Sequence, residues 1–248
     1  MMNIAQYLDS TYLKTPAQSG ISNEETLQKD KDLAQEAIDN SILAVMIRPD
    51  YVSEIKKYIR EKNSDVIVGT VIGFHEGTYS VDEKLAEASK AIQHGADELD
   101  FVINYNAYLN GDLELVKEEF VKCTQLCIEN HKVAKWIIEI AALTDEQIAD
   151  LTKKISNWAE ENFSENDLPN IFVKSSTGFY ETTGGKPNGA TFEGVKIMLD
   201  NAGKLPVKAA GGVRTPEDAE KMINMGVKRI GTSSALGLIK NQSSSEGY

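Results

Sequence analysis

Two lysines at the ends of short apolar runs are the side chains of this chain best suited to chemistry. Lys174 follows Ile171-Phe172-Val173, and Lys208 follows Pro206-Val207. An ammonium group without a partner is costly to bury, so lysine is rare inside such runs. Burial and a second ammonium nearby both favour loss of the proton, and the neutral amine is a nucleophile. We therefore expect a lysine that reacts as a neutral amine.

A neutral lysine can attack a carbonyl carbon and form an imine, or Schiff base. The protonated imine withdraws electrons, so a neighbouring carbon–carbon bond can break or form without a metal. With a pKa of ~10.4, roughly one lysine in 2,500 is neutral at pH 7, whereas a pKa of ~7 leaves about half of it neutral. A group that moves protons is also required, and Asp100 and a charged Lys208 are the candidates.

Apolar runs of strand length alternate with helical patterns along the chain. Eight such runs in 248 residues favour a (β/α)8 or TIM barrel over a doubly wound sheet. No stretch rich in Pro, Gly or Ser divides the chain, so we expect one α/β barrel domain over residues 1–240 and a polar, mobile tail over 241–248. The expected strands are Leu8–Leu13, Ile42–Ile47, Val66–Ile72, Glu98–Ile103, Lys135–Ala141, Asn170–Ser175, Pro206–Ala210 and Lys228–Thr232.

The alternation of side chains along a strand predicts which polar groups face the barrel interior. In Leu99–Asn104 the odd positions are large and apolar, so Asp100 should point inward. The same pattern places Glu139, Lys174 and Lys208 inward. A single inward acid or lysine is as often part of a structural ion pair, but four from four strands are rarely accidental. We expect them to meet at the C-terminal mouth of the barrel, where active sites of this fold lie.

Two glycine-containing segments are suited to holding a phosphate group. One follows the seventh expected strand and contains Gly211 and Gly212; the other contains Gly231, Ser233 and Ser234 and enters a short helix. Loops in these places form the usual phosphate site of the barrel, because glycine lets backbone N–H groups approach the anion. Two adjacent glycines alone would be weak evidence, so the prediction rests on both loops following the right strands.

Composition excludes several classes of partner and site. The net charge of −12 argues against nucleic acid or an anionic membrane as a partner. The N-terminus does not resemble a signal peptide, and no apolar run approaches the ~20 residues of a membrane span. Cys123 and Cys127 lie four residues apart without a second Cys/His pair, which predicts reduced thiols and no zinc site. We expect a cytoplasmic protein without a metal or other cofactor.

Five segments, in order along nearly the whole chain, resemble the motifs of the deoxyribose-phosphate aldolase family. Each motif alone is only moderately specific, but their combination is highly specific. The segments are residues 8–14 (the opening Asp-x-Thr-x-Leu), 98–104 (the acid motif of the fourth strand), 172–179 (the Schiff-base lysine), 207–215 (the second lysine) and 229–234 (the last phosphate loop).

The resemblance implies a metal-independent class I aldolase, a lyase. It would reversibly cleave 2-deoxy-D-ribose 5-phosphate to acetaldehyde and D-glyceraldehyde 3-phosphate in deoxyribonucleoside catabolism. By matching position, Lys174 would form the imine and Asp100 would move protons. Lys208 would depress the pKa of Lys174, and Asp9 would support Lys208. The resemblance places the phosphate among Gly178, Gly211, Gly212, Gly231, Ser233 and Ser234.

The chain departs from the family pattern beside the expected site. Phe179 stands where some members have a lysine, so a phosphate contact from that position is missing. The loop over residues 179–189 is longer than usual and could change substrate access. His75 lies in a loop where apolar residues are common, and a solvated loop residue is favoured over a catalytic base. Tyr248 ends the chain, as a tyrosine does in some members, and a free tail is an equally good interpretation.

Two other enzymatic functions and a binding function use some of the same residues. A phosphate-binding barrel isomerase would use Glu139 or Asp100 as its base, with Lys174 only neutralising charge. Another Schiff-base sugar-phosphate aldolase would share the lysines and differ in substrate. A non-catalytic sugar-phosphate binding protein would not require both lysines and Asp100. In each case the partners are small sugar phosphates or aldehydes, and barrels of this type often form homo-oligomers.

Overall fold

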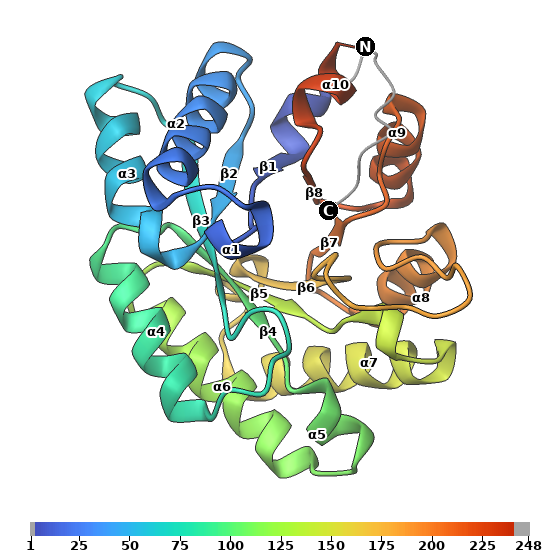
Figure 1. The fold of residues 1–248 in the computed structure, drawn as a ribbon. Helices are drawn as coiled ribbons and strands as arrows, with labels where there is room; N and C mark the ends of the chain where they lie inside the picture. The colour runs from blue at the N-terminus through green and yellow to red at the C-terminus, as the bar shows by residue number, and fades with distance from the viewer. Residues whose placement is uncertain (1–2, 241–248) are drawn as a thin grey trace.

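Eight parallel strands close into a barrel in the computed structural model, which describes residues 3–240 (Figure 1). Each strand pairs with its neighbours in sequence, and β8 pairs with β1 to close the barrel. This confirms the predicted single (β/α)8 barrel. The strands are β1 (Leu8–Thr11), β2 (Ala44–Ile47), β3 (Ile67–Ile72), β4 (Glu98–Val102), β5 (Val133–Ile137), β6 (Ile171–Lys174), β7 (Val207–Ala210) and β8 (Arg229–Thr232).

Helices surround the barrel and cover the outward faces of its strands (Figure 1). The α-helices are α1 (Pro16–Ser19), α2 (Asn23–Asp39), α3 (Val52–Glu61), α4 (Val81–Gln93), α5 (Tyr105–Leu109), α6 (Leu113–Glu129), α7 (Asp145–Asn162), α8 (Phe192–Asn201), α9 (Pro216–Met225) and α10 (Ala235–Ile239). The 3-10 turns in the described part of the chain are η1 (Ile4–Tyr7), η2 (Pro49–Tyr51), η3 (Ile140–Ala142) and η4 (Leu168–Asn170).

Local sequence signals explain where several helices begin. The helices α2, α4 and α7 each start with a capping box, in which a Ser or Thr and a later Glu or Gln satisfy free backbone N–H groups. The Thr215 side chain caps α9, and Pro216 follows at the first helical position. These starts lie between strands, so each helix can return the chain across the outside of the barrel to the next parallel strand.

Apolar side chains from the strands and helices form the core between the two layers. Phe101 and Trp136 on the outward faces of β4 and β5 stack with ring centroids 4.9 Å apart. Phe120 of α6 packs against Trp136 at 5.3 Å. All three are fully buried, which leaves the opposite faces of β4 and β5 for the polar interior of the barrel.

The predicted fifth strand is wrong at its C-terminal end. The structure ends β5 at Ile137, and Glu139 has a left-handed backbone (φ 57°) before the 3-10 turn η3. Strand periodicity therefore does not apply to Glu139, because its backbone has already left the extended conformation. The direction of the Glu139 side chain is instead given by its hydrogen bonds to Thr177.

Two further expectations concern the chain outside the barrel interior. Cys123 and Cys127 are free and buried on α6, as predicted for reduced thiols. No helix within residues 3–240 is long and apolar enough to span a membrane. The predicted tail 241–248, including Tyr248, lies outside the described residues.

Candidate active site

Lys174 and Lys208, the two lysines at the ends of apolar runs, contact the same carboxylate inside the barrel. The Nζ atoms of Lys174 and Lys208 lie 2.8 Å and 2.7 Å from Oδ2 of Asp100. Lys174 and Lys208 face each other in the β6–β7 register, so their side chains start from adjacent positions. Lys174 is 4% exposed and the other two are fully buried. The expected convergence of these three residues is therefore present.

More ionisable residues lie around this trio than the sequence argument placed there. Asp9 of β1 lies 2.5 Å from Lys208 Nζ through its Oδ2. Arg229 of β8 donates to Asp9 and makes two bonds of 2.8 Å to Glu98 of β4. Lys135 of β5 donates to Glu98 and Asp100. We call these seven residues the interior network: Asp9, Glu98, Asp100, Lys135, Lys174, Lys208 and Arg229.

Three members of the interior network were missed although a local signal for them existed. Glu98 has the same strand parity as Asp100, and Arg229 the same parity as Gly231. Lys135 stood at the start of the expected fifth strand, whereas β5 begins at Val133 and places it in the middle. Parity applied to every ionisable strand residue would therefore have found all three.

Lys174 is the member whose charged form is disfavoured. Burial, together with Lys208 and Lys135, lowers the pKa of Lys174 from 10.5 to about 8 against the attraction of Asp100. At a pKa near 8, about one molecule in ten carries the neutral amine at pH 7. Of the two lysines that contact Asp100 Oδ2, Lys174 is the one with some exposure, since Lys208 is fully buried. A carbonyl compound entering from the mouth would meet Lys174 first.

The partners of Lys174 are held in their charged forms. Burial alone would raise the pKa of Asp100, but Lys135, Lys174 and Lys208 outweigh it and hold that pKa well below its usual value. Burial alone would lower the pKa of Lys208, but Asp100 and Asp9 outweigh it and raise that pKa. Asp100 is therefore a carboxylate between Lys208, which stays charged, and Lys174, which loses its proton more readily, and this suits proton transfer between them.

Glu139 does not join the lysines and instead holds the loop after β6. Its Oε2 accepts hydrogen bonds from the backbone N–H (3.1 Å) and the hydroxyl of Thr177. The Thr177 hydroxyl in turn accepts from the N–H of Phe179 at 3.0 Å. Burial raises the pKa of Glu139 to about 7 against the opposing effects of Thr177 and Lys174. Glu139 is thus near Lys174 electrostatically, but its hydrogen bonds order the loop that contains Gly178.

The loops after β6 and β7 present backbone N–H groups at the mouth. Gly178 (φ 81°) and Gly212 (φ 76°) have left-handed backbones, which glycine adopts without strain. Within the described residues, neither N–H makes a hydrogen bond. The N–H of Gly211 donates to Gly231 in β8. Gly178 and Gly212 are therefore the glycines of this set with N–H groups available to an anion.

The remaining residues of the predicted phosphate set occupy two different places. Ser233 and Ser234 follow β8 and line a cavity of about 560 Å³. Gly231 lies inside β8, where a Cβ atom would come within 3.3 Å of Lys208 Cε. The missing side chain at Gly231 therefore leaves space for Lys208.

Lys14 connects the two sides of the mouth. It lines the cavity of Ser233 and Ser234, and it also lines a second cavity of about 560 Å³ that contains Gly178. Lys14 is exposed and makes no ion pair within the described part of the chain. The segment 8–14 contains Lys14 but its motif assigns it no role, and strand parity does not apply to it because it lies in the loop after β1.

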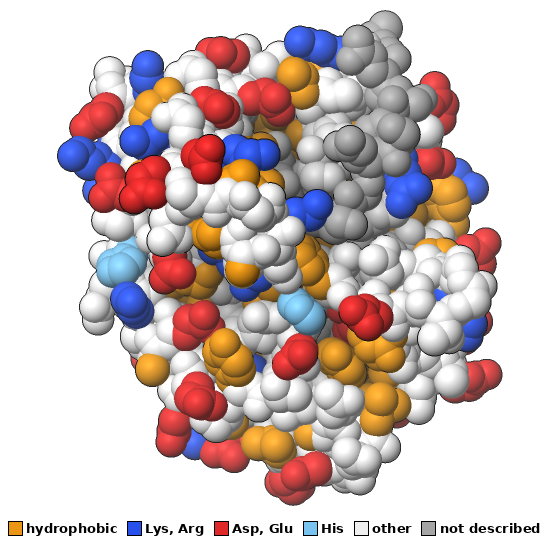
Figure 2. Space-filling view, viewed as in Figure 1, with side chains coloured by type: hydrophobic (Ala, Val, Ile, Leu, Met, Phe, Trp, Pro, Cys, Tyr) orange, Lys and Arg blue, Asp and Glu red, His pale blue; other side chains and the backbone are white. Residues whose placement is uncertain are grey.

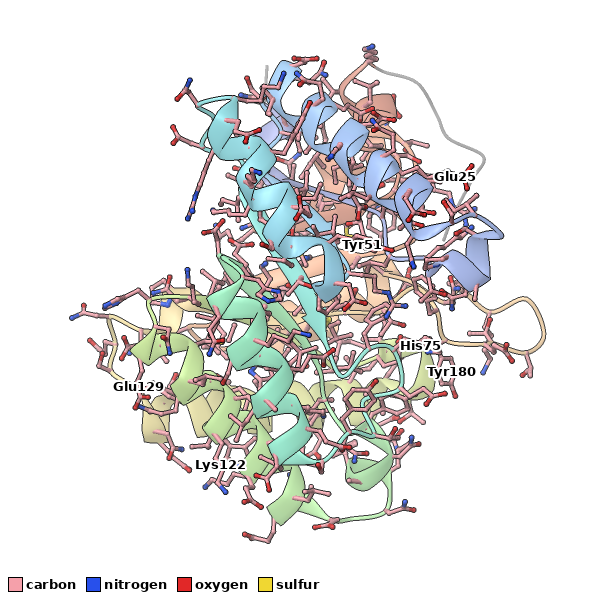
Figure 3. All side chains as sticks on the ribbon, turned by 60° about the vertical axis from the view of Figure 1, so that its left-hand side comes forward. Glu25, Tyr51, His75, Lys122, Glu129 and Tyr180 are labelled. Atoms are coloured by element: carbon pink, nitrogen blue, oxygen red, sulfur yellow. The ribbon has the colours of Figure 1, made fainter. Side chains whose placement is uncertain are left out.

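The long loop 179–189 and the loop after β3 form a wall beside the mouth. Phe179 contacts the rings of Phe74 (5.1 Å) and His75 (5.6 Å, stacked), and Asn188 donates to the carbonyl of Gly178. His75 and Tyr180 project at the same end of the molecule (Figure 3). His75 is thus a packing residue of this wall. In the space-filling view, cationic side chains lie in a hollow near the centre of this face, with acidic ones spread around it (Figure 2).

Within residues 3–240, no group of three or more His, Cys, Asp or Glu side chains is arranged to hold a metal ion. The three carboxylates of the interior network, Asp9, Glu98 and Asp100, are each contacted by Lys or Arg. The arrangement offers an amine nucleophile, a carboxylate that links it to a second lysine, and N–H donors for an anion.

Comparison with known proteins agrees with this chemistry. The sequence profile described as DeoC/LacD family aldolase matches residues 4–240. Deoxyribose-phosphate aldolase of Thermococcus kodakarensis is 40% identical over 238 residues, covering 96% of each chain. That of Deinococcus radiodurans is 37% identical over 248 residues, covering all of both chains. The tetrameric deoxyribose phosphate aldolase of Aeropyrum pernix has a TM-score of 0.76 at 28% identity, covering 96% of this chain and 89% of that chain. The chain belongs to the DeoC/LacD family of aldolases.

Proposed function

We propose that this aldolase reversibly cleaves 2-deoxy-D-ribose 5-phosphate to acetaldehyde and D-glyceraldehyde 3-phosphate through an imine at Lys174, in deoxyribonucleoside catabolism. The observation that carries the proposal is Lys174 itself. It is buried, its pKa is lowered to about 8, and its Nζ contacts Asp100. The choice of substrate rests on the relatives described above, which are deoxyribose-phosphate aldolases.

Cleavage begins when the neutral Nζ of Lys174 attacks the C1 aldehyde carbon of the open-chain sugar. Loss of water gives the iminium, which accepts the electron pair of the C2–C3 bond as the proton leaves the C3 hydroxyl. The triose phosphate departs and leaves an enamine. Protonation of C2 and addition of water then release acetaldehyde and restore the amine. Asp100 and Lys208, joined by a 2.7 Å hydrogen bond, carry these protons.

The phosphate is bound at the mouth by the loops after β6, β7 and β8. Gly178 and Gly212 contribute N–H groups, Ser233 and Ser234 add hydroxyl donors, and Gly211 shapes the turn before Gly212. Lys14 supplies a positive charge between the two cavities, in a chain that has Phe179 where some members have lysine. Gly231 acts indirectly by leaving room for Lys208, and Asp9 supports Lys208 through its ion pair with Nζ.

We further propose a cytoplasmic homo-oligomer. The Aeropyrum pernix relative is tetrameric, and the two cysteines are free, as is usual for proteins of reducing compartments.

Trapping of the imine tests the proposed reaction. The protein is incubated with deoxyribose 5-phosphate or acetaldehyde and sodium borohydride, and the modified residue is located by peptide mass spectrometry. We expect a two-carbon adduct on Lys174 with acetaldehyde, and absence of an adduct there would refute the proposal. Lys174→Arg separates this function from an isomerase. Arginine could still neutralise charge for an isomerase, but it cannot form the imine.

A further inference from the structure

The charges of the interior network balance only when Lys174 is neutral. Its acids are Asp9, Glu98 and Asp100, which come from β1 and β4. Its other cations are Lys135, Lys208 and Arg229, from β5, β7 and β8. Three negative charges therefore meet three positive charges before Lys174 is counted. A charged Lys174 would be a fourth cation without a fourth acid in a nearly water-free interior.

Lys135 is the cation of this network that touches all of its acids. Its Nζ donates to Glu98, lies 3.1 Å from Asp100 Oδ1 and lies 3.9 Å from Asp9 Oδ2. The side chain is fully buried, so it has no access to substrate at the mouth. By taking Oδ1 of Asp100, Lys135 leaves Oδ2 to Lys174 and Lys208. Each oxygen of Asp100 is thus compensated before substrate arrives.

We propose that Lys135 is a positioning residue that favours the neutral, nucleophilic form of Lys174, by cancelling negative charge that would otherwise hold a proton on Lys174. The inference rests on the proposed imine chemistry and adds the charge that makes it work. Lys208 alone does not provide this charge, because its contacts are with Asp9 and Asp100 while Glu98 is contacted by Lys135 and Arg229.

One other ionisable group near Lys174, Glu139, adds to this count only as the pH rises past neutral. Within the eight described strands, β2 and β3 contribute no ionisable side chain. Glu139, which follows β5, is held by Thr177 and has a pKa raised to about 7 by burial. It can add part of a negative charge above neutral pH, which would act against the neutral amine. The negative charge that Lys135 has to offset near Lys174 therefore increases as the pH rises.

Opposite charge changes in the network should move the protonation of Lys174 in opposite directions. Lys135→Met removes a positive charge, so a proton on Lys174 would restore balance. Glu98→Gln removes a negative charge and disfavours that proton. The double variant Lys135→Met/Glu98→Gln restores the balance. We expect the acidic limb of kcat/KM against pH to move up by roughly one pH unit in the first, down in the second and back near the parent in the third. Lys135→Arg, which keeps the charge, should stay close to the parent.

A second readout reports Lys174 directly. The rate of adduct formation with acetaldehyde and sodium cyanoborohydride at Lys174 is measured between pH 6 and 9 for each variant. If Lys135→Met does not fold, the other two variants still test the inference. The acidic limb should move down in Glu98→Gln and return toward the parent in the double variant. Limbs that stay in place, or that move in the same direction in both single variants, would overturn the inference. Absence of any adduct in the parent protein would instead refute the proposed function.

Discussion

Lys84 and Lys174 are both buried and both contact a carboxylate, yet only Lys174 is placed to react. Lys84 of α4 lies 2.5 Å from Glu119 of α6 and donates to the carbonyl of Val102 at 2.8 Å. The other oxygen of Glu119 accepts the N–H of Asn104 at 2.6 Å. Lys84 is fully buried. Lys174 is almost as buried, but it shares Asp100 with Lys135 and Lys208.

The difference shows that burial of a lysine does not by itself make a nucleophile. The Lys84 pair has one cation for one acid, and each group has a further hydrogen bond: Lys84 donates to a backbone carbonyl and Glu119 accepts from a backbone N–H. Lys174 is the surplus cation of the interior network, and it lies next to the mouth. Charge count and access, more than depth, separate the structural lysine from the candidate catalytic one.

Removal of Lys174 should cause the largest loss of activity. For Lys174→Met we expect kcat/KM with deoxyribose 5-phosphate to fall by roughly 10⁴- to 10⁶-fold, because the nucleophile is gone. Stability should change little or increase, since the surplus cation of the network is removed. A coupled assay of triose phosphate release and urea unfolding measure the two effects. Residual activity within tenfold of the parent would contradict the comparison.

Removal of Lys84 should have the reverse outcome. In Lys84→Met, Glu119 loses its cation while it stays buried, so we expect about 3 to 5 kcal/mol less unfolding free energy. The kcat/KM per folded molecule should stay within about twofold, because an isolated structural pair does not touch the reacting atoms. Chemical denaturation measures the unfolding free energy. Titration of active sites by the borohydride adduct gives the concentration of folded enzyme that kcat/KM requires. A loss of turnover comparable to that of Lys174→Met would show that the two sites are not separate.

Asp30 of α2 is a buried acid without a cation in the described part of the chain, in contrast to Glu119 and Asp100, which both contact lysines. Neither carboxylate oxygen has a hydrogen-bond partner within residues 3–240, and burial raises its pKa to about 8. The unfolded chain releases this proton near pH 4, so stability should fall as pH rises from about 4 to 8 and then level off. We expect Asp30→Asn to gain about 2 to 3 kcal/mol at pH 8 and progressively less toward pH 5. Urea unfolding of both proteins across this range measures the gap, and a gap independent of pH would contradict the assignment.

Lys14 should give the smallest effect, because it is exposed and acts only on the phosphate. For Lys14→Ala we expect KM for deoxyribose 5-phosphate to rise about tenfold, as for loss of one charge-assisted contact. Turnover of unphosphorylated deoxyribose should be unchanged. The exposed Lys57 of α3 offers a matched control, since Lys57→Ala removes a surface lysine far from Gly178 in sequence and outside both cavities. Equal effects on both sugars would rule out a role in phosphate recognition.

Much of this arrangement follows from local patterns in the sequence. The eight apolar runs, the capping boxes before α2, α4 and α7, and the inward parity of Asp100, Lys174 and Lys208 all depend on residues close together in the chain. The side-chain period of a strand is a local property, so it predicts direction reliably while the backbone stays extended. It misled at Glu139 because the chain leaves β5 after Ile137, where tertiary contacts with Thr177 decide its position.

The sequence alone therefore determined the barrel, the two lysines and their family. The family resemblance assigned the imine to Lys174, but only the tertiary structure shows why its pKa is lowered, because that pKa depends on charges brought from β1, β4, β5, β7 and β8 to within a few ångströms. Coulomb interactions add over groups that are distant in sequence, and no local pattern records their sum. The same holds for Lys14, whose place between two cavities exists only once the loops after β1, β6 and β8 meet.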